Sequence, residues 1–153
     1  MSDICPEAKA VASAFFPTST AFLRLMHGHS RMVPAGLTPQ QMKIIMELDI
    51  AGTLRLSDLS RFACVTHGTM TVAVQKLLKK GLLLKKKDPV DERAVALVLT
   101  ARGKGVARQI YRSTEELFHM ICKDLSQKER RRLAEAYRFL LKTYQEIVEQ
   151  KGI

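Results

Sequence analysis

The fold is decided by residues 66–100, which read THGTMTVAVQKLLKKGLLLKKKDPVDERAVALVLT. The first half carries apolar side chains at the spacing of one helical stripe: Met70, Ala73, Val74, Leu77 and Leu78. Thr66 can cap the start of this helix and Gly81 can end it. Residues 69–74 also alternate and are rich in β-branched side chains, as a strand would be. We favour a helix, because the stripe extends through Leu78 and the stop signal follows it.

The second half predicts a hairpin. Residues 82–87 and 94–99 read as two strands, and they flank the polar turn Asp88-Pro89-Val90-Asp91-Glu92. A run of three lysines ends the first strand, at residues 85–87. A helix followed by a basic hairpin is typical of a winged helix.

Signals for further helices precede residues 66–100, the central part of the chain. Thr38 and Gln41 form a capping box, and the helix that they open should stop near Gly52. A short alternating run at residues 54–56 predicts a strand. Ser57 is expected to cap the short helix that follows, so the centre reads as a helix-turn-helix before the hairpin.

Long helices are predicted at both ends of the chain. Pro17 is expected to interrupt the N-terminal helix, which ends at residues 34–36. Thr100 caps a long helix, and Ser126 with Glu129 forms a second capping box. The last helix carries an apolar seam: Leu133, Tyr137, Leu140, Tyr144 and Ile147. These helices are too long to bury their apolar faces against so small a centre, so we expect them to pair with another chain.

Charge gives the first indication of function. The 153 residues fit one globular domain, and the net charge is +10. Most of the excess lies in residues 57–104, with ten basic and four acidic side chains, which indicates an anionic partner. No apolar run approaches the ~20 residues of a membrane span, and the N-terminus lacks the pattern of a signal peptide. We therefore expect a cytoplasmic protein with no membrane partner.

The sequence offers no catalytic motif. It has no Gly-rich phosphate loop, no G-x-S-x-G and no set of metal-spaced ligands, so we predict no enzyme activity, no cofactor and no metal. Cys5, Cys64 and Cys122 are too far apart to indicate a disulfide framework. The nearness of Cys64 to His67 keeps thiol chemistry as an alternative, and a cysteine-based redox sensor is another.

Several short motifs occur in a specific order over about residues 37–133. They are Leu37-Thr38-Pro39-Gln40-Gln41, Leu56-Ser57-Asp58-Leu59, Thr69-Met70-Thr71 with Leu77, Gly81-Leu82, Asp91-Glu92-Arg93 six residues before Leu99-Thr100, Gly103, and Leu125-Ser126 with Glu129. In these motifs the chain resembles the MarR family of bacterial transcription regulators. It departs from the family at Val72 and Leu78, where a polar residue and a glutamate are frequent.

The resemblance implies a mainly α fold with a small β-hairpin wing, in which a winged helix-turn-helix is flanked by long dimerisation helices. Residues 1–36 and 101–153 are then the dimerisation helices and 37–100 the DNA-binding lobe of one intertwined domain. The implied function is a ligand- or stress-responsive repressor that binds a pseudo-palindromic operator in double-stranded DNA as a homodimer. A small molecule, or oxidation of a cysteine, would change its DNA affinity. The alternative is a winged helix that binds protein or RNA.

The wing supplies one set of expected DNA contacts. Lys85, Lys86 and Lys87 would neutralise phosphates and release counterions. Arg93 matches the family arginine that enters the minor groove, and Asp91 would hold its guanidinium in a bidentate pair.

The recognition helix supplies the other set: Thr66, His67, Gly68, Thr69, Thr71, Val72, Gln75 and Lys76. Gln75 can read adenine and Val72 can touch a thymine methyl, whereas Lys76 suits a phosphate. The amides near His67 and Gly68 can meet a phosphate through the positive end of the helix dipole.

Candidate effector-binding residues are His27, His29, Arg31 and Met46. In the family this region borders the cleft between the dimer helices and the DNA-binding lobe. Two histidines two residues apart lie on different faces of a helix, so we expect no metal here. The alternative is that they are ordinary histidines at a helix end.

Overall fold

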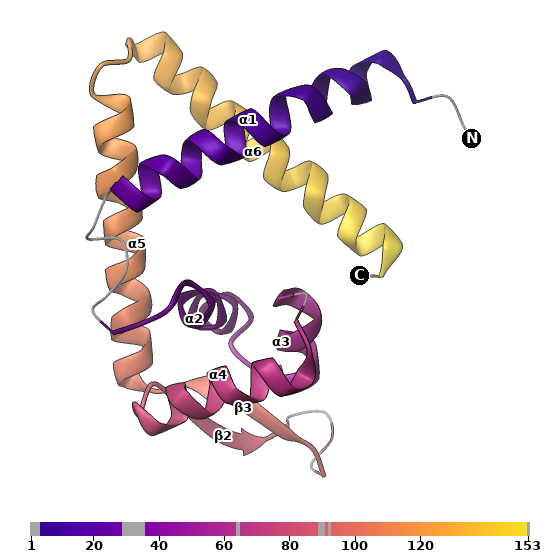
Figure 1. Cartoon of the computed structure of the whole chain (residues 1–153), viewed down its shortest axis with the longest axis vertical. Coiled ribbons are helices and arrows are strands. Elements are labelled where there is room, and N and C mark those ends of the chain that lie inside the picture. The colour runs from indigo at the N-terminus through magenta and orange to yellow at the C-terminus, as the bar shows by residue number, and fades with distance from the viewer. Residues whose placement is uncertain (1–3, 29–35, 64, 89–90, 92, 153) are drawn as a thin grey trace. The chain divides into compact units, whose positions relative to one another are not determined.

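The computed structural model describes residues 4–28, 36–63, 65–88, 91 and 93–152. The elements are α1 (Pro6–Gly28), α2 (Pro39–Ala51), β1 (Leu54–Arg55), α3 (Leu56–Ala63), α4 (His67–Lys79), β2 (Leu83–Lys87), β3 (Val95–Leu99), α5 (Ala101–Cys122) and α6 (Gln127–Lys151) (Figure 1). This order is the predicted one, element for element. The chain divides into two units, Met1–Glu115 and Glu116–Ile153.

The core of the first unit forms where α2 and α4 bury apolar stripes against the sheet. Ile45 on α2 and Met70 and Leu77 on α4 are fully buried, and they belong to one cluster with Leu83 and Leu97 of the hairpin. Burying a side chain of this size contributes about 1.5–3 kcal/mol. In Figure 1, α2, α3 and α4 lie together above the hairpin of β2 and β3.

Residues 67–79 form a helix, so the strand alternative for residues 69–74 is wrong. Thr66 caps the helix, because its hydroxyl oxygen accepts a hydrogen bond from the amide of Thr69 at 3.3 Å. Gly81 follows the helix with a φ of 66°, a left-handed conformation that favours glycine. The apolar stripe buries a whole face of the helix, and this burial outweighs the strand preference of the six alternating residues.

The sheet has the strand order β1-β3-β2, and all pairs are antiparallel. The hairpin is confirmed, and β1 pairs with the other edge of β3. In the hairpin, β2 and β3 pair in the register Leu83 with Leu99, Lys85 with Leu97, Lys86 with Ala96 and Lys87 with Val95.

Two local predictions are wrong. Pro17 lies inside α1 rather than interrupting it. A proline removes a single backbone donor, and the rest of a 23-residue helix keeps its hydrogen bonds. Ser57 does not cap α3, which begins one residue earlier, at Leu56. The carboxylate of Asp58, within the first turn, accepts a hydrogen bond from the backbone amide of Arg55 at 3.2 Å. This hydrogen bond caps the start of the helix.

Both predicted capping boxes are present. Thr38 and Gln41 exchange hydrogen bonds of 3.1 and 3.2 Å at the start of α2. Ser126 and Glu129 do the same at the start of α6. The hydrogen bond from the Ser126 side chain, followed by that from its backbone, lowers the pKa of Glu129.

The first turn of α5 lies against the hairpin. The Thr100 hydroxyl donates to the Gly81 carbonyl at 2.7 Å and accepts the Gly103 amide at 3.0 Å. The Thr100 amide donates to the Leu82 carbonyl at 3.0 Å. Glycine is required at position 103, because a Cβ there would collide with the Leu82 carbonyl oxygen.

Gly103→Ala should therefore lower the free energy of unfolding, by about 1–3 kcal/mol, because α5 must move away from the hairpin. Gly105→Ala is the matched control, since a Cβ there would lie 4.0 Å from Arg108 Nη2, which is an ordinary contact. This control should be neutral or gain up to about 1 kcal/mol from helix propensity. Urea unfolding followed by circular dichroism measures both, and equal stabilities would contradict the predicted collision.

Candidate nucleic-acid interface

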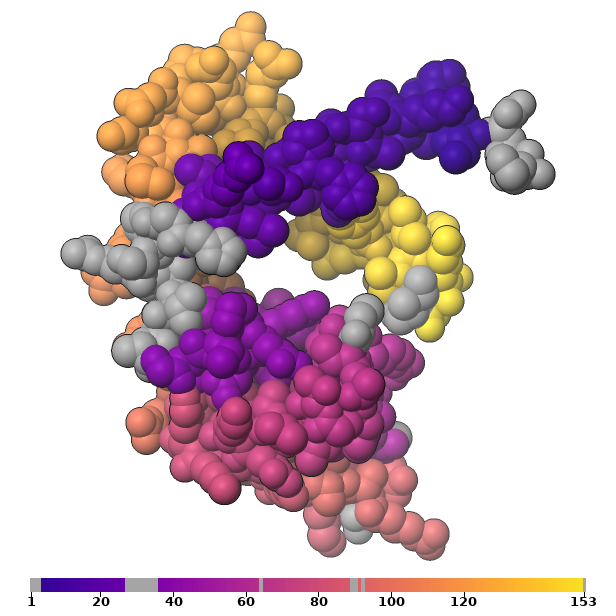
Figure 2. All heavy atoms as spheres, in the orientation of Figure 1, coloured from indigo at the N-terminus to yellow at the C-terminus, as the bar shows by residue number. Residues whose placement is uncertain are grey.

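The outward face of α4 carries side chains that were predicted to meet DNA. Thr69, Gln75 and Lys76 are exposed, and Val72 is 53% exposed. The helix contains no acidic residue, and Lys76 and Lys79 lie in its last turn. In Figure 2 the magenta to salmon atoms of residues 67–88 and 93–99 lie together at the lower end of the view. This face of α4 is polar, cationic and open to a partner.

The start of α4 is also open. The Thr71 hydroxyl donates to the His67 carbonyl at 2.8 Å, and the hydroxyls of Thr66 and Thr69 lie 2.9 Å apart. A Cβ added at Gly68 would meet nothing within 4 Å. The amides of this first turn, at the positive end of the helix dipole, therefore lie at an uncrowded surface that suits an anion.

A groove of about 190 Å³ lies between α4 and the sheet. Thr71 and Gln75 line it on the helix side, and Lys85 and Val95 line it on the strand side. The structure thus brings predicted contacts of the recognition helix together with one predicted contact of the wing.

The three wing lysines do not share one face. All three are exposed, but successive side chains of a strand project to opposite faces of the sheet. Lys85 lines the groove beside α4, whereas Lys86 lines a different pocket together with residues of α2 and α5. Lys87 shares the face of Lys85 by the same alternation. Lys86 is therefore separated from the other predicted contacts.

The base of the wing is held by an ion pair that sequence reasoning missed. Arg55 Nε and Nη2 donate to the two oxygens of Asp88 at 2.8 and 2.9 Å. Asp88 is buried, and its Oδ1 also accepts the amide of Asp91 at 2.9 Å. The hydrogen bond with Asp88 is the main cause that raises the pKa of Arg55. The two residues are 33 apart in sequence, so no local pattern could have indicated the pair.

Asp91 contacts Arg93 differently from the prediction. Its Oδ1 accepts the backbone amide of Arg93 at 3.1 Å, where a pair with the guanidinium was expected. Short acidic side chains favour this contact to an amide two residues on, because it closes a turn. The Arg93 side chain is exposed.

A second groove, of about 310 Å³, lies between the start of α2 and α4. Thr38 and Gln40 line it on one side, and Thr69, Val72 and Lys76 on the other. Sequence reasoning had treated the first turn of α2 only as a helix start. Its closeness to α4 is a tertiary contact, and it extends the candidate interface beyond the predicted residues.

Comparison with known proteins finds a similarity to one family. A profile of the MarR family matches residues 37–95. The transcriptional regulator FarR of Neisseria gonorrhoeae is 34% identical over 87 residues, which are 57% of this chain and 60% of FarR. Residues 37–95 are therefore similar to the MarR family. The chain spans about three fifths of the length of the first curated relatives that it matches.

Similar solved structures confirm the predicted winged-helix fold. Apo MarR of E. coli aligns with a TM-score of 0.69 and 21% identity over 91% of this chain and 99% of that chain. BpsR of Bordetella bronchiseptica, whose DNA binding is regulated by 6-hydroxynicotinic acid, aligns with a TM-score of 0.58 and 22% identity over 80% of this chain and 89% of that chain. The curated relatives are transcriptional regulators, which supports the prediction of a regulator rather than an enzyme.

The candidate effector residues are only partly described. Met46 is half-buried and packs against the core. His27 lies in α1, but its side chain is outside the described part, as are His29, Arg31 and Cys64. Within the described ranges, no cluster of three or more His, Cys, Asp or Glu could hold a metal ion. In the same ranges, no helix combines the length and the apolar character needed to cross a bilayer.

Replacing Asp88 should loosen the wing. Asp88→Ala removes the acceptor of the Asp91 amide, so that amide should exchange its hydrogen roughly tenfold faster. Asp88→Asn keeps an acceptor oxygen, although it loses the charge pair with Arg55. The exchange rate of the Asp91 amide in this variant should therefore stay closer to the rate in the unchanged protein. Hydrogen exchange followed by NMR measures both. Unaltered exchange in Asp88→Ala would contradict the anchoring role.

Proposed function

We propose that the chain is a DNA-binding transcriptional repressor that acts as a homodimer on a pseudo-palindromic operator and responds to a small-molecule effector. Residues 37–100 serve as the DNA-binding lobe, and residues 1–36 and 101–153 serve as the dimerisation helices. The observation that carries the proposal is the groove that Thr71 and Gln75 of α4 share with Lys85 of the wing.

On this proposal, α4 enters the major groove of the DNA. Gln75 then reads adenine, Val72 contacts a thymine methyl, and Lys76 pairs with a phosphate. The first-turn amides beside His67 and Gly68 meet a second phosphate, which their open surroundings favour.

The wing contacts the adjacent backbone and minor groove. Lys85 and Lys87 neutralise phosphates, and Arg93 enters the minor groove, where narrow A·T tracts concentrate negative potential. The exposure of Arg93 and the contact of Asp91 with its backbone amide, rather than its guanidinium, support this role, because the guanidinium is accessible to DNA.

Arg93→Ala should weaken binding to operator DNA obtained by in vitro selection by about 1–3 kcal/mol while the protein stays folded. Arg138→Ala, which removes an exposed cation of α6, is the matched control and should bind as the unchanged protein does. Fluorescence anisotropy over a range of salt measures both, and log affinity should fall by about 0.9 per phosphate contact per log unit of salt. A partner bound independently of salt would favour the protein-binding alternative, and unchanged affinity in Arg93→Ala would refute the wing assignment.

The apolar faces of the terminal helices support a homodimer. The 25-residue helix α6 has no buried residue, although Tyr137, Leu140, Tyr144 and Ile147 lie along one seam. The exposed apolar residues of α1 include Val11, Phe15, Phe16, Leu23 and Leu25. Large apolar patches of this kind mark interaction sites in soluble proteins.

Introducing charge on the seam of α6 should dissociate the dimer. Leu140→Glu combined with Tyr144→Glu should give a monomer, because the two carboxylates cannot be paired in an apolar interface. Gln145→Glu places a carboxylate beside the seam on the same helix and should leave the dimer intact. Sedimentation equilibrium measures both, and a dimer that persists in the double variant would rule out this seam as the interface.

Responsiveness to a small molecule is proposed from the structural likeness to BpsR, whose DNA binding 6-hydroxynicotinic acid regulates. The predicted effector residues His27, His29, Arg31 and Met46 remain one proposed location for such a ligand.

A further inference from the structure

The first half of α6 is strongly basic. Residues 128–138 carry five basic and two acidic side chains, and all of these are exposed. One of the acids, Glu129, is engaged in the capping box at the start of the helix. Within the described residues, no carboxylate forms an ion pair with Lys128, Arg131 or Arg132. This part of α6 therefore presents positive charge to solvent.

The stability of the helix does not account for these cations. The positive end of the helix dipole lies at the start of α6, where a basic side chain is unfavourable. Lys128 is in the first turn of the helix. Lys128 and Arg132 are four residues apart, and like charges at this spacing destabilise a helix. A negatively charged partner bound at this position would relieve both effects.

An aromatic ring lies on the same face of α6 as these cations. Because an α-helix has about 3.6 residues per turn, Phe139 lies two turns beyond Arg132 on one face. Phe139 is 70% exposed. We call this surface the basic face of α6, and its members are Lys128, Arg131, Arg132 and Phe139.

The basic face lies opposite the apolar seam of α6. Tyr137 belongs to that seam, and its ring packs edge-on against Phe118 of α5 with the ring centroids 5.5 Å apart. Phe139 follows two residues later, and a helix turns by about 200° over two residues. A dimer formed through the seam, as proposed above, therefore leaves the basic face open to another molecule.

We propose that the basic face docks an acidic segment of a partner protein. Arg131 and Arg132 bind carboxylates of the segment, because a guanidinium group can form two parallel hydrogen bonds with a carboxylate. Phe139 receives an apolar side chain of the segment, and aromatic and arginine side chains are enriched at protein interfaces. This inference goes beyond the proposed function, because docking at α6 requires no operator.

The charges on this face favour a protein segment over a nucleic acid. Glu135 is exposed and lies on the same face, between the arginines and Phe139. A continuous chain of phosphates would have to pass this carboxylate, whereas an acidic segment can place its separate carboxylates on either side of it. The expected partner therefore combines separate carboxylates with an apolar side chain.

The test uses a fluorescein-labelled peptide in which pairs of glutamates alternate with single leucines. Fluorescence anisotropy should show that this peptide binds the full-length protein. A matched peptide with glutamine in place of every glutamate should bind at least about tenfold more weakly, because the charge-assisted hydrogen bonds are lost. No binding of the acidic peptide, or equal binding of the glutamine peptide, would overturn the proposal.

Substitutions on α6 locate the site. Arg131→Ala combined with Arg132→Ala should weaken binding of the acidic peptide by about tenfold or more. Phe139→Ala should weaken it by about threefold or more, because the apolar contact is lost. All three side chains are exposed, so the fold should persist. Unchanged peptide affinity in both variants would refute the assignment to this face.

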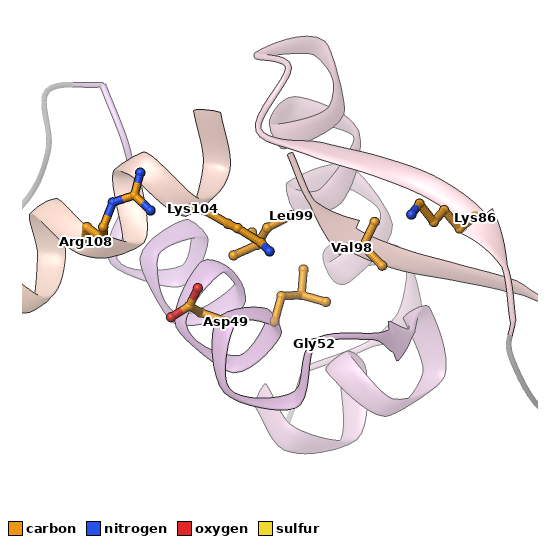
Figure 3. A pocket seen from close by; sticks show the side chains of 8 residues that line it. Asp49, Gly52, Lys86, Val98, Leu99, Lys104 and Arg108 are labelled. Carbon is orange, nitrogen blue, oxygen red and sulfur yellow. The ribbon is translucent and has the colours of Figure 1, made fainter. Parts of the chain in front are cut away.

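The matched control removes two cations from another helix. Lys104 and Arg108 of α5 are exposed and line a separate pocket of about 490 Å³ together with Lys86 (Figure 3). Lys104→Ala combined with Arg108→Ala changes the net charge by as much as the double substitution on α6, and it should leave peptide binding unchanged. Equal losses in the two double variants would show a general charge effect and overturn the proposal.

Other occupants of the basic face give different results. A single-stranded oligothymidylate that binds as tightly as the acidic peptide, and loses affinity in the same α6 variants, would show a nucleic-acid site and overturn the proposal. A lower molar mass of Phe139→Ala in sedimentation equilibrium would show that this face joins copies of the chain, and would also overturn it. A protein that binds the peptide through the basic face but binds no operator would refute the proposed function and leave the docking site standing.

Discussion

The burial of one face of α4 determines the rest of the candidate interface. Met70 and Leu77 are fully buried against α2 and the hairpin, and a helix with 3.6 residues per turn then has its opposite face fixed outward. Val72, Gln75 and Lys76 occupy that outward face because the core stripe leaves them no other orientation. The direction in which α4 presents its polar side chains is therefore a consequence of core packing and not of contacts among the polar residues themselves.

The wing depends on a second constraint, which is electrostatic. A hairpin with several lysines repels itself, because its like charges lie close together. The pair of Arg55 and Asp88 ties the end of β2 to the end of β1, and the same carboxylate accepts the amide of Asp91. One buried aspartate thus links β1, β2 and the loop that leads to Arg93. This one carboxylate therefore anchors the described start and end of the loop to the sheet.

Sequence reasoning succeeded where the signals are local and repeated. The capping boxes of Thr38 and Ser126, the stripe through Leu77 and the glycine stop at position 81 each depend on residues within a few positions of one another, and all four are present. It failed where the structure depends on distant residues or on a balance of free energies. Arg55 and Asp88 are 33 residues apart, so their pairing follows from the sheet and not from either neighbourhood. Pro17 was predicted to interrupt a helix that continues past it, because the loss of one hydrogen bond did not outweigh the remaining length of α1.

The candidate site shows the same limit in the lysine run at residues 85–87. The sequence identified the cations but treated them as one cluster, whereas the pleat of β2 assigns neighbours to different faces. Leu83 is buried, and its pairing with Leu99 fixes the register of the hairpin. A slip of one residue would place Leu83 on the outer face and exchange the environments of Lys85 and Lys86. The hydrophobic register of two strands therefore decides which lysine lies beside α4 and which lies in the pocket with Lys104 and Arg108, although neither lysine contributes to that register.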